Sequence, residues 1–289
     1  MKIAFSTTAC PDWTIEEVAN KAAQFGYLGV ELRSFYDQSV EIASEPFGMD
    51  PDTIESVFAK AGVKSLSFGT SISFDKMINP PVVGRIFQNE EAGVSDTKSY
   101  VDLADRSNTH YVRVFGNNLP AAEPKTWSMR RVSNRLKLAA QTGRNTDVRV
   151  LIENAGSFAT STALLELIQS VDSQWLGASF NTIASVQAGE CPLDGVKLLG
   201  DHIKVIKIGD IDHDGNPVML GEGILPLKMF IGVLAEMNYD GWIVYEYPKL
   251  WLTEEGLDPE TVLKHAADTL YQWINAVPES AGACTSCTS

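Results

Sequence analysis

A lysine stands near the end of a short apolar run, Ile203-Lys-Val-Ile-Lys-Ile208, where a charged group needs a chemical explanation. The Val and Ile content of this run, and the helical pattern after it, are typical of a buried parallel strand. Because side chains alternate along a strand, Ile203, Val205 and Lys207 share one face. A cation at the mouth of an apolar strand is costly unless carboxylates surround it. The sequence therefore predicts acidic partners for Lys207.

Three other predicted strands offer polar groups at matching positions. Alternation along these runs places Glu153, Asn181 and Glu246 at the inward ends of their strands. Two carboxylates, one amide and one ammonium would then face a common cavity. Such a set of groups can transfer protons, stabilise a developing negative charge or bind a polar ligand.

The elements that must position these residues alternate between strand and helix along most of the chain. The predicted strands cover 2–6, 28–32, 63–68, 110–115, 148–152, 176–180, 203–208 and 242–245. The predicted helices cover 15–25, 51–61, 90–104, 127–142, 160–171, 192–199, 226–237 and 259–276. Eight such alternations predict an α/β fold, a single (β/α)8 TIM barrel over residues 1–277. In these barrels the functional site lies at the C-terminal ends of the strands.

Composition restricts the class of partner. The chain has 289 residues, of which 44% are hydrophobic, and a formal net charge of −14, so it can bury a large core and should repel nucleic acid. No signal peptide or membrane-spanning run is found, and the four scattered cysteines favour a reducing cytoplasm. The polar tail 278–289 is predicted to be flexible, and its Cys284 and Cys287 are weak evidence for zinc.

Several short motifs, in their order and spacing, resemble one known family. They are Ala9-Cys-Pro-Asp-Trp13, Gly29-Val-Glu-Leu-Arg33, Val112-Arg-Val-Phe-Gly116, Leu151-Ile-Glu-Asn154, Leu220-Gly-Glu-Gly223, Tyr239-Asp-Gly-Trp242 and Glu246-Tyr-Pro-Lys-Leu-Trp251. On these motifs the chain resembles the sugar phosphate isomerase/epimerase family of xylose isomerase-like TIM barrels, which also includes endonuclease-IV-type enzymes. The resemblance implies a small polyol or sugar-like substrate that carries a carbonyl, and by analogy a homodimer.

The metal site that the resemblance implies is only partly present. Family members usually hold one divalent metal with Glu, Asp, His and Glu at the ends of strands five to eight. Glu153 and Glu246 match the two Glu positions, but Asn181 stands at the Asp position and Lys207 at the His position. A protonated lysine has three donors and no acceptor, and it would repel a metal ion. We therefore expect no metal cofactor, with Lys207 occupying the place of the metal.

Three functions remain open at this point. In the first, Glu153 and Glu246 form an acid/base pair on opposite faces of a carbonyl substrate, and Lys207 stabilises the enediolate or acts as a base or Schiff-base amine. That enzyme would catalyse epimerisation, isomerisation, elimination or ring closure. In the second, the protein binds a sugar without catalysis, and Lys207 is only a salt-bridge partner. In the third, Mn²⁺ or Mg²⁺ binds Glu153 and Glu246, with Asp210 or His213 recruited.

Further residues near strand ends are candidates for substrate binding, namely Trp13, Glu31, Arg33, Arg113, Asn181 and Asp210. Trp13 could form an apolar wall, whereas Glu31 and Arg33 could meet a substrate hydroxyl or anion, or pair with each other. The turn-forming sequence Asp212-His-Asp-Gly215 predicts a small hairpin after the seventh strand.

Overall fold

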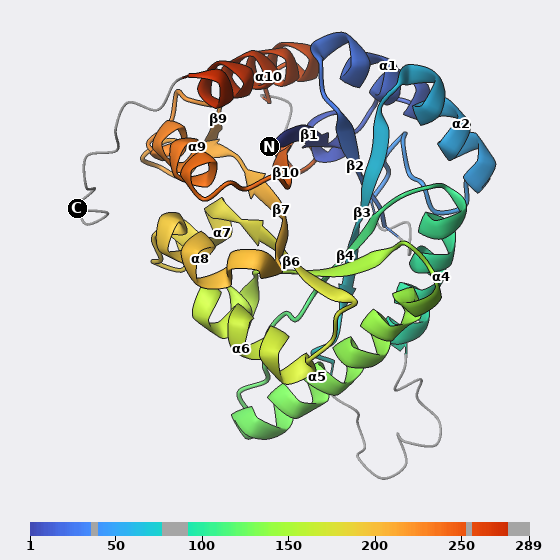
Figure 1. Cartoon of the computed structure of the whole chain (residues 1–289), viewed down its shortest axis with the longest axis vertical. Helices are drawn as coiled ribbons and strands as arrows, with labels where there is room; N and C mark the ends of the chain where they lie inside the picture. The colour runs from blue at the N-terminus through green and yellow to red at the C-terminus, as the bar shows by residue number, and fades with distance from the viewer. Residues whose placement is uncertain (36–39, 77–91, 253–255, 277–289) are drawn as a thin grey trace.

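Eight parallel strands form a closed barrel in the computed structural model, which describes residues 1–35, 40–76, 92–252 and 256–276. Figure 1 shows the strands inside a ring of helices. The strand order around the barrel is β1-β10-β7-β6-β5-β4-β3-β2. The strands are β1 (Lys2–Ser6), β2 (Gly29–Arg33), β3 (Lys64–Ser73), β4 (Tyr111–Phe115), β5 (Arg149–Glu153), β6 (Leu176–Asn181), β7 (Ile203–Ile208) and β10 (Trp242–Tyr245). This architecture confirms the predicted (β/α)8 barrel.

Helices return the chain from the end of one strand to the start of the next. They are α1 (Ile15–Phe25), α2 (Pro51–Ala61), α4 (Ala92–Arg106), α5 (Lys125–Gln141), α6 (Ser161–Val171), α7 (Thr182–Gln187), α8 (Pro192–Leu199), α9 (Leu227–Glu236) and α10 (Pro259–Asn275). Their ends follow local signals in the sequence. Thr14 and Glu17 form a capping box at the start of α1, and Gly26 ends that helix in the left-handed region at φ 84°.

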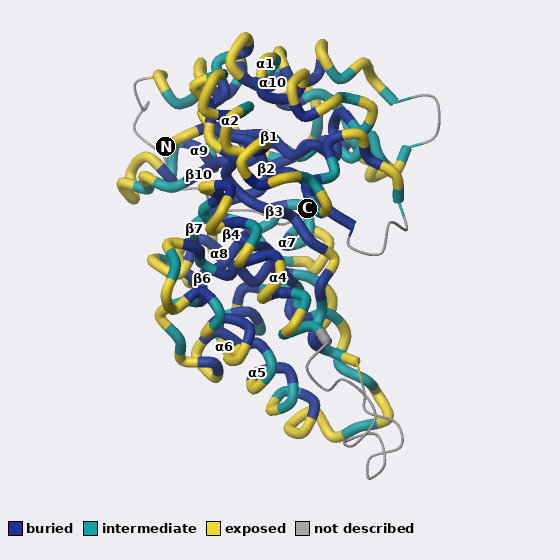
Figure 2. The backbone as a smooth tube through the Cα atoms, turned by 90° about the vertical axis from the view of Figure 1, so that its right-hand side faces the viewer, coloured by how far each residue is buried: buried dark blue, intermediate teal, exposed yellow. Residues whose placement is uncertain are grey.

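Apolar side chains pack in two layers. The larger layer fills the space between strands and helices. Figure 2 shows buried residues along the central strands and exposed residues mainly on the surrounding helices and loops. The smaller layer lies inside the barrel and consists of Ala4, Leu66, Leu151, Val205, Trp242 and Val244. The inward face predicted for Val205 is therefore confirmed, and this inner layer forms an apolar floor beneath the polar strand ends.

The inward face predicted for Ile203 is wrong. Ile203 belongs to the outer layer, between strands and helices. The reason is a register shift between β6 and β7: Ala178 pairs with Ile203, but the next residue, Ser179, pairs with Val205. The extra residue interrupts the simple alternation of side chains at the start of β7.

Two local elements follow the last inward residues of β6 and β7. The short helix α7 begins directly after Asn181, and the sequence did not predict it. The predicted hairpin after the seventh strand is confirmed, because β8 (Asp210–Ile211) pairs antiparallel with β9 (Pro217–Val218). Within the described residues, no helix has the length and apolar character needed to cross a bilayer. The tail 278–289 lies outside the described residues.

Candidate active site

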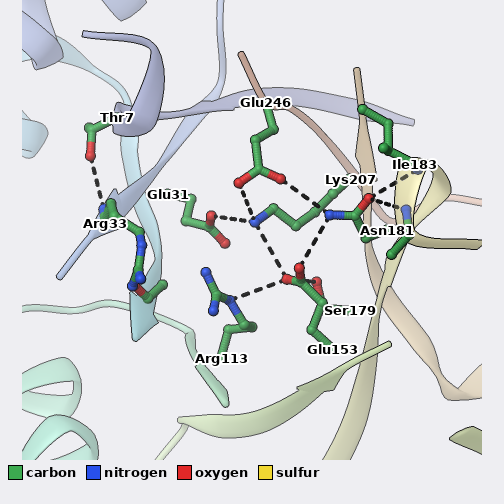
Figure 3. Close-up of polar contacts among 12 residues, drawn as sticks. Thr7, Glu31, Arg33, Arg113, Glu153, Ser179, Asn181, Ile183, Lys207 and Glu246 are labelled. Carbon is green, nitrogen blue, oxygen red and sulfur yellow. Dashed lines mark hydrogen bonds and ion pairs between the residues drawn. The ribbon is translucent and has the colours of Figure 1, made fainter. Parts of the chain in front are cut away.

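Lys207 lies inside a cage of three carboxylates at the C-terminal end of the barrel (Figure 3). Its Nζ atom lies 3.0 Å from Oε1 of Glu31 and 3.0 Å from Oε1 of Glu246. Oε2 of Glu153 lies at 3.4 Å, and the lysine side chain is 1% exposed. The contact with Glu246 is a hydrogen bond, and Glu31 and Glu153 pair with the ammonium through their charge. The structure thus brings the three proposed catalytic residues together and adds Glu31 to them.

The protonation state of Lys207 depends on a competition between burial and charge. Burial favours the neutral amine and alone would lower the pKa of Lys207, but Glu153, Glu246 and Glu31 together raise it above its ordinary value. Burial alone would raise the pKa of Glu31, whereas Lys207 and Arg113 lower it. Lys207 is therefore an ammonium at neutral pH. This result disfavours the Schiff-base and general-base roles, which need a neutral amine.

Glu31 reaches Lys207 across the barrel. It lies on β2, which pairs with β1 and β3, whereas Lys207 lies on β7. Glycine at position 69 of β3 makes room for this contact, because a Cβ on Gly69 would lie 3.1 Å from the Glu31 carboxyl carbon and 3.1 Å from Nη2 of Arg113. The Glu31 side chain is 1% exposed. In this position Glu31 serves as a buried counter-ion of Lys207.

Glu153 has the most partners of the three carboxylates. Its Oε2 atom accepts from Oγ of Ser179 at 3.4 Å and lies 3.2 Å from Nε of Arg113. Its Oε1 atom accepts from Nδ2 of Asn181 at 3.3 Å. Arg113 is itself held by the carbonyl of Thr70, to which its Nη1 donates at 2.5 Å. Arg113 on β4 therefore fixes the position of Glu153 on β5.

The orientation of the Asn181 amide is set by the helix that follows it. Its Oδ1 atom accepts from the backbone N–H groups of Ile183 and Ala184 at 3.0 and 3.2 Å, as the N-cap of α7. The Nδ2 group must then point the other way, where it donates to Glu153 and Glu246 at 3.3 Å each. Asn181 thus presents donors, not an acceptor, to the two carboxylates.

Asn154 holds Asn181 in place and was not singled out from the sequence. Its buried side chain accepts from the backbone N–H of Asn181 at 2.6 Å and donates to the carbonyl of Asn181 at 3.0 Å. It also donates to the carbonyl of Ala159 at 3.2 Å. The available signal was its place directly after Glu153, since an asparagine there can join the ends of β5 and β6.

The cage is open to solvent mainly at Glu246. The Glu246 side chain is 24% exposed, compared with 7% for Glu153, and Asn181 is half-buried. A ligand that enters the barrel mouth therefore meets Glu246 and Asn181 before Lys207. This arrangement can accept a proton at Glu246 and stabilise negative charge with the cation behind it.

Arg33 and Trp13 lie at the same end of the barrel but outside the cage. Arg33 ends β2, and no ion pair joins it to Glu31 within the described residues, so the structural pairing suggested by the sequence does not form. Trp13 is partly buried and packs against the layer between strands and helices. Neither residue contacts Lys207.

Asp210 is also outside the cage, and its carboxylate holds a loop. Oδ1 accepts from the backbone N–H groups of Ile211 and Leu225 at 3.0 and 3.3 Å. Oδ2 accepts from those of Gly221 and Gly223 at 2.9 and 3.0 Å. These four bonds satisfy both oxygens of a buried carboxylate. The structure therefore assigns Asp210 to the rim loop of residues 220–223.

We expect Asp210→Ala to destabilise the protein by about 3 kcal/mol, because four backbone N–H groups lose a charged acceptor. Denaturant unfolding measures this loss. Asp214→Ala, at an exposed position of the same hairpin, is the control and should change stability by less than about 0.5 kcal/mol. Equal stability of the two variants would contradict the role assigned to Asp210.

The residues between Glu153 and Glu246 do not fit a divalent metal. Nζ of Lys207 fills the space that a metal ion bound by both carboxylates would occupy. Asn181 offers them an N–H group, and its oxygen is already used by α7. Among the described residues, no three His, Cys, Asp or Glu side chains form a group that could hold a metal ion. The donor set suits a caged ammonium.

The fold and the site define a class: a (β/α)8 barrel with ionisable side chains gathered at the C-terminal ends of its strands. The model of the xylose isomerase-like TIM barrel family matches residues 19–273. The chain therefore belongs to this family, as the motifs indicated. No curated protein matches the sequence.

Solved structures of similar fold include three enzymes. L-ribulose 3-epimerase is 14% identical, with a TM-score of 0.77, and the match covers 95% of each chain. The probable 3-DHS dehydratase AsbF from Bacillus anthracis is 17% identical, with a TM-score of 0.72, over 94% of this chain and 99% of that one. A D-psicose 3-epimerase, solved in the presence of D-fructose, is 14% identical, with a TM-score of 0.74, over 95% and 99%. At these identities the likeness establishes the fold alone.

Proposed function

We propose that the protein is an enzyme that moves a proton next to the carbonyl of a small polyhydroxylated substrate, without a divalent metal. The observation that carries this proposal is the caged ammonium of Lys207, bounded on its open side by Glu246. The sugar epimerases and the dehydratase among proteins of similar fold support the reaction class. Isomerisation, epimerisation, elimination and ring closure all begin with this step.

We assign proton abstraction to Glu246, because it is the most exposed carboxylate of the cage. The C–H bond next to the carbonyl breaks, an O–H bond forms on Glu246, and the electron pair moves to the carbonyl oxygen. One negative charge therefore leaves Glu246 and appears on the enolate oxygen. Glu153, which the sequence paired with Glu246 as acid and base, contacts four donor groups, and we assign it to holding the cation during this step.

Lys207 serves both charged states of this step. Before proton transfer one of its N–H groups donates to Glu246 at 3.0 Å. Once Glu246 is protonated, its attraction for the ammonium falls, and that N–H group can turn to the enolate oxygen. The cation thus exchanges one anionic partner for another while the total charge of the site stays constant.

Proton exchange in D₂O tests this proposal. The wild-type protein is incubated with L-ribulose, D-psicose, D-fructose and 3-DHS, and proton NMR follows the hydrogens next to each carbonyl. We expect exchange or conversion of at least one compound without added metal and in the presence of a chelator. Glu246→Gln should slow it by roughly 10²–10⁴-fold, because the base is lost.

Glu236→Gln, at an exposed position at the end of α9, is the matched control and should retain the wild-type rate. Exchange that requires added Mn²⁺, or a wild-type rate in Glu246→Gln, would contradict the proposal.

Binding without catalysis is the second candidate, and one observation favours it: three carboxylates already surround the Lys207 ammonium and balance its charge. A protein of this kind would bind one of the same compounds in calorimetry without exchange or product. Its affinity would survive Glu153→Gln. Any turnover by the wild-type protein excludes this alternative.

A further inference from the structure

Arg33 is a buried cation whose partners are all neutral. Its Nη1 group donates to the backbone carbonyls of Ser34, at 2.9 Å, and of Gly69. Its Nη2 group donates to Oγ of Ser71 at 2.6 Å. The residue is 7% exposed. These bonds hold the guanidinium in one orientation at the end of β2.

No carboxylate pairs with Arg33 within the described part of the chain. Its neighbour Arg113 forms an ion pair with Glu153, and Lys207 forms ion pairs with Glu31 and Glu246. Burial and, next, the charge of Arg113 lower the pKa of Arg33 to about 10, so the guanidinium remains charged at neutral pH. A buried cation without a charged partner costs folding free energy, so its presence here points to a function.

Two donors of Arg33, Nε–H and the second N–H of Nη2, are available to a ligand. The Nε–H group donates to none of the described residues. Nε is also not one of the fully buried, unpartnered polar atoms among them. The ring of Phe35 lies against the guanidinium, with its centroid 4.0 Å from Cζ, so the plane of the fork is fixed. Figure 3 shows Arg33 on the same side of the site as Glu31. A planar oxyanion could therefore bind here without rearrangement of the arginine.

We propose that Arg33 binds a carboxylate of the substrate, so that the substrate is a polyhydroxy acid rather than a neutral sugar. This inference rests on the proposed function of the same site, since it adds a binding group to the carbonyl substrate. Lysine could not replace this arginine, because an ammonium lacks the planar fork.

The charge count of the site favours a carboxylate over a phosphate. Lys207, Arg113 and Arg33 carry three positive charges, against three negative charges on Glu31, Glu153 and Glu246. A carboxylate would add one negative charge to this neutral cluster and pair it directly with Arg33, which has no other charged partner among the described residues. A phosphate monoester, with nearly two negative charges at neutral pH, would add a second negative charge that the three cations of this cluster leave unpaired.

Calorimetry with two matched probe pairs tests the inference. D-Gluconate and D-sorbitol differ only in a terminal carboxylate, and D-fructose 6-phosphate and D-fructose differ only in a phosphate. For the wild-type protein we expect D-gluconate to bind at least roughly 10-fold more tightly than D-sorbitol, as for a charge-assisted bidentate contact. In Arg33→Gln the two affinities should become equal, and in Arg33→Lys the preference should be mostly lost.

Arg144→Gln is the matched control, because Arg144 is exposed in the turn after α5, at the opposite end of the barrel. It should keep the preference for D-gluconate. Arg33→Lys retains the charge and so guards against loss of the fold in Arg33→Gln, and thermal unfolding of each variant verifies that it is folded.

Three results would overturn the inference: equal binding of D-gluconate and D-sorbitol by the wild-type protein, an unchanged preference in Arg33→Gln, or tighter binding of D-fructose 6-phosphate than of D-gluconate. Absence of binding by every probe also counts against it. Because the readout is binding, its failure is separable from that of the proposed function. An acid that binds through Arg33 but never exchanges a proton would reject the enzyme and keep the carboxylate site.

Discussion

Replacing Lys207 with methionine should destabilise the protein by about 3–5 kcal/mol at neutral pH, as expected when one partner is removed from a buried ionic cluster. Methionine fills a similar volume, so the loss reports charge more than packing. Glu31, Glu153 and Glu246 would then face one another, and among the described ion pairs of the cage the one from Arg113 to Glu153 would remain. Urea unfolding measures the effect. The three contacts of its ammonium with carboxylates are the reason for this expected loss.

Acidification should change the contribution of Glu31 to folding stability in opposite directions in the wild type and in Lys207→Met. In the wild type, the pKa of Glu31 lies below its ordinary value of 4.5, so Glu31 contributes stability above that value and loses it as the pH falls further. Without Lys207, burial raises the pKa of Glu31, and protonation then stabilises the folded state as the pH falls from neutral. The gap between wild type and Lys207→Met should therefore narrow on acidification.

Adding Glu31→Gln to Lys207→Met supplies the control for this interpretation. Removing one carboxylate together with the cation should recover part of the lost stability, and a double-mutant cycle gives the coupling energy. If Lys207→Met is as stable as the wild type at neutral pH, or loses stability further on acidification, the ionic cage is not what the lysine stabilises.

Replacing Asn181 with Asp and Lys207 with His in the same chain should create a site for a divalent metal. The pair would restore the Glu, Asp, His and Glu set that the family resemblance implies, around Glu153 and Glu246. The wild type should take up no Mn²⁺ at millimolar concentration, because the ammonium fills the site. The double variant should take up one ion per chain, by elemental analysis and calorimetry.

The single variants show why the two residues go together. Asn181→Asp alone would add a fourth carboxylate, about 3.3 Å from Glu153 and Glu246, to the three that already surround Lys207, so it should destabilise the fold without binding metal. Lys207→His alone lacks the added negative charge and should bind Mn²⁺ weakly. A stoichiometric metal at Glu153 and Glu246 in the wild type would refute the idea that Lys207 replaces it.

Strand alternation was sufficient to predict which residues gather at the barrel mouth. Glu153, Asn181, Lys207 and Glu246 share one property that sequence reveals, the last inward position of a strand. The role of Glu31 could not be predicted, because its partner lies across the barrel and depends on accumulated register. Register shifts on both sides, between β2 and β3 and between β6 and β7, break the simple count.

Two further features, the protonation state of Lys207 and the orientation of Asn181, could be assigned only from interatomic distances in the structure. The competition between burial and carboxylates at Lys207 is decided by contacts of 3.0–3.4 Å, which no pattern of residues encodes. The orientation of Asn181 depends on α7, a helix too short to give a periodic signal, whose first N–H groups claim the amide oxygen. The residue types at the strand ends could therefore be predicted, whereas their contacts and side-chain orientations could not.

The carboxylate cage also has a consequence for the order of folding. Its members come from β2, β5, β7 and β10, so the last contact cannot form until the first and final quarters of the chain have met. We expect contacts between such distant segments to form late, because closing a long loop costs entropy before the contact is made. The cage then contributes little to the rate of folding and much to the slowness of unfolding. We therefore expect loss of the cage to speed the opening of the closed barrel more than it slows its closure.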